Sequence, residues 1–123
     1  MYEMTFKITA LVEEDESGQH VFKVFEKAKA DADLWFYVIT TFHQDLYRPM
    51  LAGDILTITF HTPGEEDRII AHFREDKQWG YAFDIKGQEP SPDLAVLENI
   101  YETTLQKLHI GETLTITFYV CRV

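Results

Sequence analysis

Alternating apolar and polar residues near the start of the chain predict a β-hairpin. Every second residue from Met4 to Val12 is apolar, a period that is typical of a strand with one buried face. An acidic stretch that ends at Gly18 follows, and Gly commonly interrupts regular structure. The next apolar segment, residues 20–26, predicts a second strand, which would pair with the first.

A four-residue spacing of apolar side chains then predicts a helix from Asp31 to about Tyr47. Asp31 is expected to cap the first turn, and Asp33 suits the positive end of the helix dipole. Pro49 cannot continue a helix and is expected to end it. The residues of the apolar stripe are Leu34, Val38, Phe42 and Leu46.

A short motif occurs twice in the chain. Residues 53–60 read Gly-Asp-Ile-Leu-Thr-Ile-Thr-Phe, and residues 111–118 repeat six of these eight positions. In both copies Leu, Ile and Phe alternate with other residues, as in a half-buried strand. A repeated unit that cannot bury its own apolar face is usually stacked on its copy. We therefore predict one domain built from two units, about residues 1–62 and 63–123.

The second unit is predicted to hold two strands, residues 68–74 and 79–85, followed by a helix. Ser91, Pro92 and Asp93 form the cap, the first helical position and the acidic first turn of a typical helix start, and Gly111 is expected to end the helix. This clear signal also decides the first unit, where the β-branched and aromatic residues 35–41 alone favour a strand.

Matching the apolar positions predicts the register of the strands. Pairing Phe60 with Ile69, and Phe73 with Tyr81, places the apolar residues of three strands on one face. A one-residue slip would turn them to opposite faces. The fold class is thus α+β: two ββαβ units related by a pseudo-twofold axis, forming an antiparallel sheet with both helices on one face. The outer face would carry Thr57, Thr59, Thr113, Thr115, Thr117 and Tyr119.

Charge narrows the range of partners. The chain has 21 acidic and 11 basic residues and a net charge of −10, so it should repel nucleic acids and anionic membranes. No stretch resembles a membrane span or signal peptide. The single cysteine, Cys121, excludes an internal disulfide and suits a reducing compartment. We expect a cytoplasmic protein.

Aromatic residues suggest a binding function more than catalysis. The chain contains no phosphate-binding loop, nucleophile elbow, paired-cysteine zinc motif or His-Glu-x-x-His sequence. We therefore expect a non-catalytic module without a cofactor. Trp35, Trp79 and Tyr81 are candidates to wall a groove between the two units, which would suit a small apolar or cationic molecule, or a peptide.

Two alternatives remain open at this stage. His43, Asp45 and His109 lie at corresponding ends of the two helices, and they are further candidates for the ligand site. If the pseudo-twofold axis brings them together, they could serve a small enzyme or a metal protein. Otherwise they only complement the helix dipoles. The second alternative is an acidic interaction or inhibitor module that engages a basic protein, or that self-associates as a homodimer.

Overall fold

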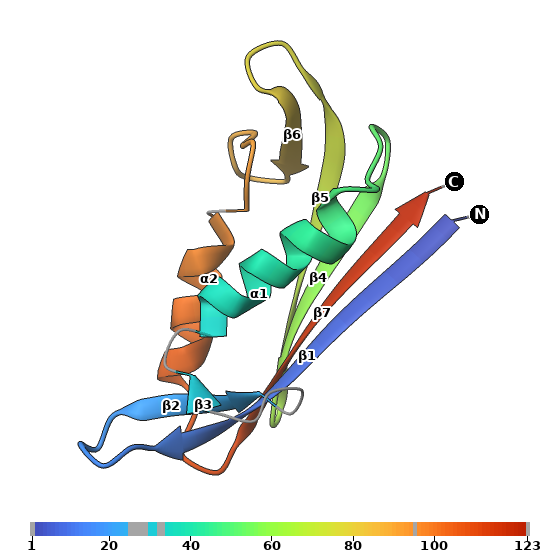
Figure 1. The fold of residues 1–123 in the computed structure, drawn as a ribbon. Helices are drawn as coiled ribbons and strands as arrows, with labels where there is room; N and C mark the ends of the chain where they lie inside the picture. The colour runs from blue at the N-terminus through green and yellow to red at the C-terminus, as the bar shows by residue number, and fades with distance from the viewer. Residues whose placement is uncertain (1, 25–29, 32–33, 95, 123) are drawn as a thin grey trace.

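The protein has a mixed α+β fold, as the sequence predicts. The computed structural model describes residues 2–24, 30–31, 34–94 and 96–122 (Figure 1). Its elements in chain order are β1 (Tyr2–Glu14), β2 (His20–Val24), β3 (Ala30–Asp31), α1 (Leu34–Phe42), the π-helical turn η1 (His43–Tyr47), β4 (Ile55–Thr62), β5 (Glu65–Asp76), β6 (Gly80–Ile85), α2 (Val96–Gln106) and β7 (Thr113–Arg122).

The strands form one sheet in the order β3-β2-β1-β7-β4-β5-β6, and all its pairings between described strands are antiparallel. Figure 1 shows the sheet strongly curled, with α1 and α2 on the same side. The two copies of the repeated motif, β4 and β7, lie side by side at its centre, with Thr59 directly opposite Thr117. The duplicated ββαβ unit itself stays a prediction.

The core lies between the helices and the inner face of the sheet. Along β4 and β7 every second residue is buried, and the intervening threonines are half-buried on the outer face. The predicted faces of these strands are therefore confirmed. Each Leu, Ile or Phe buried in this way stabilises the fold by roughly 1.5–3 kcal/mol. The predicted stripe on the first helix is also buried, at Leu34, Val38, Phe42 and Leu46.

The predicted register of the two hairpins is wrong by two residues. Phe60 pairs with Asp67, not Ile69, and Phe73 pairs with Phe83, not Tyr81. A two-residue shift keeps every side chain on its face, so the apolar pattern could not detect it. The turns decide instead: Thr62 pairs with Glu65, which leaves a two-residue turn in which Gly64 has φ +83°.

The predicted ends of the helices also need correction. Asp31 does not cap α1, because its backbone pairs with Phe22 in the sheet; Asp33, with residues 25 and 26 of the predicted second strand, lies outside the described residues. Ser91 does not begin α2. Its amide and carbonyl both bond to Phe83, at 3.1 and 2.7 Å, so it belongs to the sheet. The second helix ends at Gln106, before the predicted Gly111.

An ion pair with a buried carboxylate and a partly exposed arginine joins the segment before β4 to the end of β7. The Asp54 carboxylate is fully buried and accepts bonds from Nε and Nη2 of Arg122, at 2.7 and 3.0 Å. The Leu51 amide donates to the same carboxylate at 2.9 Å, and Arg122 also donates to the Pro49 carbonyl. The hydrogen bond from Arg122 lowers the pKa of Asp54, although burial opposes this shift.

Replacing Arg122 with alanine should lower the free energy of unfolding by about 3 kcal/mol, because it leaves a buried carboxylate without its counter-charge. Urea unfolding at neutral pH measures the change. The matched control is Arg68→Ala, whose exposed contact with Glu66 spans 3.7 Å and should be worth less than about 1 kcal/mol. Equal effects of the two substitutions would contradict the assignment.

The same ion pair predicts a pH dependence. A carboxyl group whose pKa is lower in the folded state stabilises the fold above its unfolded pKa, and this stability is lost as the pH falls through the folded pKa. The difference in unfolding free energy between the wild type and Arg122→Ala should therefore be largest near neutral pH and shrink in acid. A difference that is constant from neutral pH to below the pKa of Asp54 would count against this account.

Candidate functional site

A pocket of about 300 Å³ lies between the two helices. The helices run in opposite directions across the sheet, so the C-terminal end of the first lies near the N-terminal end of the second (Figure 1). Each helix therefore contributes one wall. The lining residues are Trp35, Ile39 and His43 from the first helical segment, Asp93 and Leu94 from the segment before α2, and Glu98 from the first turn of α2.

Trp35 ties this pocket to the core. Its ring stacks on Tyr101 of α2, with centroids 4.9 Å apart, and on Phe60 of β4 at 6.5 Å. The side chain is nevertheless only half-buried, and it lines the pocket together with the buried Leu94. The apolar wall is thus held by contacts to both the sheet and the opposite helix, so it is preformed.

The polar rim of the pocket is acidic. Asp93 and Glu98 contribute carboxylates, His43 contributes an exposed imidazole, and no Lys or Arg is among the described lining residues. Asp93 accepts a hydrogen bond from the Ser91 hydroxyl at 3.0 Å, which orients its carboxylate. Carboxylates beside an aromatic wall favour a positively charged group over an anion.

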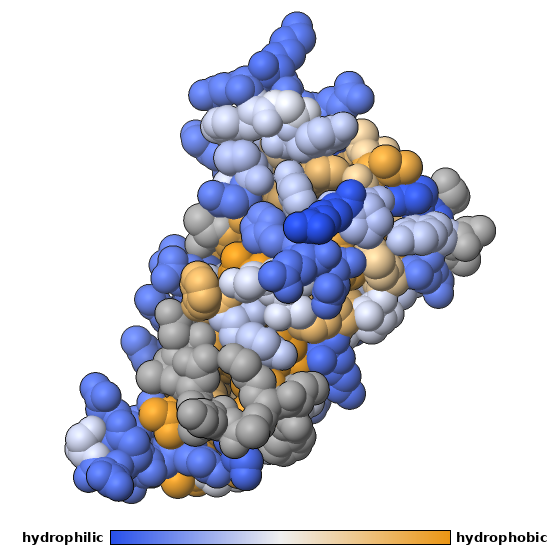
Figure 2. Space-filling view, viewed as in Figure 1, coloured by the Kyte–Doolittle hydropathy of each residue, from blue (hydrophilic) through white to orange (hydrophobic). Residues whose placement is uncertain are grey.

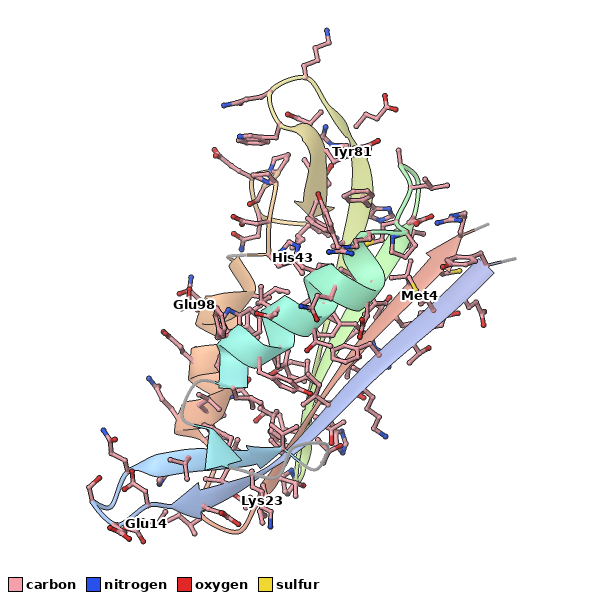
Figure 3. All side chains as sticks on the ribbon, viewed as in Figure 1. Met4, Glu14, Lys23, His43, Tyr81 and Glu98 are labelled. Carbon is pink, nitrogen blue, oxygen red and sulfur yellow. The ribbon has the colours of Figure 1, made fainter. Side chains whose placement is uncertain are left out.

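His43 is placed by the change from α-helix to π-helix at residue 43. Its ring packs edge-on against the ring of Phe42, and its centroid lies 5.1 Å from that of the Tyr47 ring. The Tyr47 ring also packs edge-on against Phe42. Single π-helical turns are rare and frequently lie at functional sites. In Figure 3 the labelled His43 and Glu98 come from the two helices, whereas Tyr81 lies on β6 beyond them.

The structure brings together only part of the candidate set. Trp35 and His43 share the pocket, but Trp79 and Tyr81 are not among its lining residues. Tyr81 stacks on Phe73 at 5.1 Å, and both it and Trp79 remain more than 40% exposed. The groove walled by all three predicted aromatic residues therefore stays a prediction.

The alternative site of His43, Asp45 and His109 can be compared with the structure. Among the residues that the structure describes, no three His, Cys, Asp or Glu side chains gather closely enough to hold a metal ion. His43, Asp45 and His109 thus do not form a metal site. The physical reason is the opposite direction of the helices, which places their C-terminal ends apart (Figure 1). His109 instead belongs to a turn, where its amide donates to Glu112.

Sequence reasoning missed Asp93 and Glu98 as pocket residues. The sequence predicts Asp93 in the first turn of a helix, but in the structure it precedes α2. No pattern in the sequence separates Glu98 from the other exposed acidic residues. The only available signal was its place in the first turn of the helix. Figure 2 shows hydrophobic surface between the polar side chains on this side of the molecule.

A second hollow of about 380 Å³ lies beside the outer edge of β5, where β6 ends. Its apolar lining includes Ile69, Ile70 and Ile85, and its polar groups are Arg68, Lys86 and Gln88. This hollow has the opposite charge preference and contains none of the six predicted site residues. The pocket between the helices is therefore the better candidate for the predicted function.

Comparison with known proteins adds no assignment: no family model, no curated protein and no solved structure matches the chain. Neither helix in the described part of the chain is long and apolar enough to cross a bilayer.

The two tryptophans should report different environments. In Trp79→Phe only Trp35 remains, and in Trp35→Phe only Trp79 remains. Because Trp79 is 45% exposed and Trp35 stacks on two rings, acrylamide should quench the fluorescence of Trp79 more strongly. Emission from Trp35 should also lie at shorter wavelength. Equal quenching in the two variants would contradict this placement of Trp35.

Proposed function

We propose that the protein is a non-catalytic binding module that holds a small molecule in the pocket between α1 and α2. The ligand would combine an apolar body with a positively charged amine. The observation that carries this proposal is the composition of the pocket lining, where the carboxylates of Asp93 and Glu98 stand beside the apolar side chains of Trp35 and Ile39.

The chemistry of the walls supports an organic cation. An amine beside the carboxylates gains charge attraction, and its apolar body can cover the exposed part of the Trp35 ring. A volume of about 300 Å³ is at the lower limit for ligand pockets. Because the rim is open to water, each charge contact should be worth about 1 kcal/mol or less. Affinity would therefore depend mainly on the apolar body.

We also infer that the pocket lies between two copies of one ββαβ unit. The central pairing supports this view: Thr59 and Thr117 are equivalent positions of the repeated motif, and they lie directly opposite each other. A twofold axis perpendicular to the sheet would pass between them. Under such an axis, one unit supplies each helix wall of the pocket.

Hydrogen bonds before the two motif strands support the same inference. The Gly53 amide donates to the backbone carbonyl of Phe73, and the Phe73 amide donates to the backbone carbonyl of Asp54. At the equivalent position, the Gly111 amide donates to the backbone carbonyl of Val12, and the Val12 amide donates to the backbone carbonyl of Glu112. In both copies the acidic side chain also accepts a bond from the amide three residues earlier, Leu51 or His109.

A pair of probes with opposite charge tests the proposed ligand class. We expect 2-phenylethylamine to bind and 3-phenylpropanoate, which has a similar body and a carboxylate, to bind much more weakly. The readout is the fluorescence of Trp35 in the Trp79→Phe variant, together with its indole amide signal in NMR spectra. Preference for the carboxylate, or no change at Trp35 with either probe, would overturn the proposal.

Glu98→Gln should weaken binding of 2-phenylethylamine by about two- to fivefold, which corresponds to the loss of one exposed charge contact. Glu102→Gln is the matched control, because Glu102 lies on the same helix and is exposed but is not among the lining residues. It should leave the affinity almost unchanged. Equal weakening by both variants would indicate only a general charge effect.

A further inference from the structure

Over most of its length, the outer edge of β1 has no described strand beside it. The neighbouring strand β2 pairs only with residues 10–14 of β1, so residues 2–9 have no strand partner on this side among the described residues. Figure 1 shows this part of β1 as the outermost strand of the sheet on that side, up to the N-terminal end. Such an edge is a template for pairing with another strand.

The direction of the backbone groups follows from the pairing with β7. The amide and carbonyl of Val12 bond to the segment 111–112 that leads into β7. In an antiparallel pair, alternate residues direct both groups to the same neighbour. Even-numbered residues of β1 therefore bond to β7, and Glu3, Thr5 and Lys7 direct their amides and carbonyls to the open edge.

We propose that a second copy of this chain pairs along this edge, with its β1 antiparallel to the first and Thr5 opposite the partner's Thr5. This register satisfies the outward backbone groups of residues 3, 5 and 7 in both copies. It also places Lys7 opposite the partner's Glu3, twice by symmetry. On the inner face, Met4 lies opposite the partner's Phe6.

The side chains suit this arrangement on both faces. Opposite charges directly across an antiparallel pair are favourable, as are apolar pairs. Met4 and Phe6 are only partly buried in one copy, and Tyr2 is 37% exposed, so pairing would bury further apolar surface. The twofold axis is perpendicular to the sheet, as expected for an isologous dimer.

Glu3 also interacts with a tyrosine of the neighbouring strand on the outer face. Its carboxylate accepts a hydrogen bond from the hydroxyl of Tyr119 on β7, and this bond, with some burial, raises the pKa of Tyr119 to about 12. A carboxylate can accept further bonds, so it remains able to meet the partner's Lys7.

The opposite edge of the sheet provides a contrast within the same molecule. The last strand, β6, pairs with residues 71–76 of β5, so residues 65–70 also have an open side among the described residues. That edge begins Glu65-Glu66-Asp67. Self-pairing centred on Glu66 or Asp67 would place like charges opposite each other, which is destabilising. Charged residues of this kind protect an edge from association.

The test compares oligomeric state in two proline variants. Thr5→Pro removes an amide that the proposed dimer uses and that β7 does not, while Glu66→Pro makes the same change on the outer side of β5. Proline is tolerated at such edge positions. By sedimentation equilibrium, the wild type and Glu66→Pro should dimerise and Thr5→Pro should remain monomeric, with circular dichroism confirming that both variants fold.

Charge reversal gives a second test that does not depend on proline. Lys7→Glu should weaken the dimer by at least about tenfold, because two attractive pairs become repulsive. Adding Glu3→Lys to Lys7→Glu should restore dimerisation to within a few-fold of the wild type. A wild-type chain that stays monomeric at the highest attainable concentration overturns the proposal, as do open-ended assemblies or a dimer that only Glu66→Pro disrupts.

Discussion

The antiparallel pairing of β4 with β7 is the constraint on which the rest of the structure depends. Each of these strands presents a Leu-x-Ile-x-Phe face that is at most 1% exposed, and both helices lie on the side of the sheet that this face forms. A slip of one residue would turn one of the two faces outward. The register with Thr59 opposite Thr117 therefore keeps both apolar faces under the helices.

The segments before these two strands show how similar sequences acquire different roles. Asp54 and Glu112 both close a turn by accepting an amide bond from three residues earlier. Only Asp54 also bonds to an arginine, and it is fully buried whereas Glu112 is partly exposed. A buried carboxylate requires a counter-charge, and a partly hydrated one does not. Arg122 therefore ties the end of β7 to one turn alone.

The sequence predicted which side chains face the core, but not how far each strand is shifted along its neighbour. Alternation specifies faces because the period of a strand is two residues. A shift of two residues preserves those faces, so Phe60 could be matched with Ile69 instead of Asp67. The predicted start of the second helix was wrong for another reason. Ser91 has the composition of a helix cap, yet its backbone bonds to Phe83, a non-local contact that local propensity cannot reveal.

The candidate site was partly predictable for the same physical reasons. Trp35 could be identified because three adjacent aromatic residues, 35–37, cannot all face the core from one helical turn. Trp79 and Tyr81 have similar chemistry, but Trp79 lies in the turn before β6, and the two-residue shift of the hairpin places Tyr81 opposite Glu75 instead of Phe73. The carboxylates of Asp93 and Glu98 reach the pocket only because α2 runs antiparallel to α1. The direction of the helices thus separates His43 from His109 and brings His43 into the same pocket as Glu98, which gives the pocket its acidic rim.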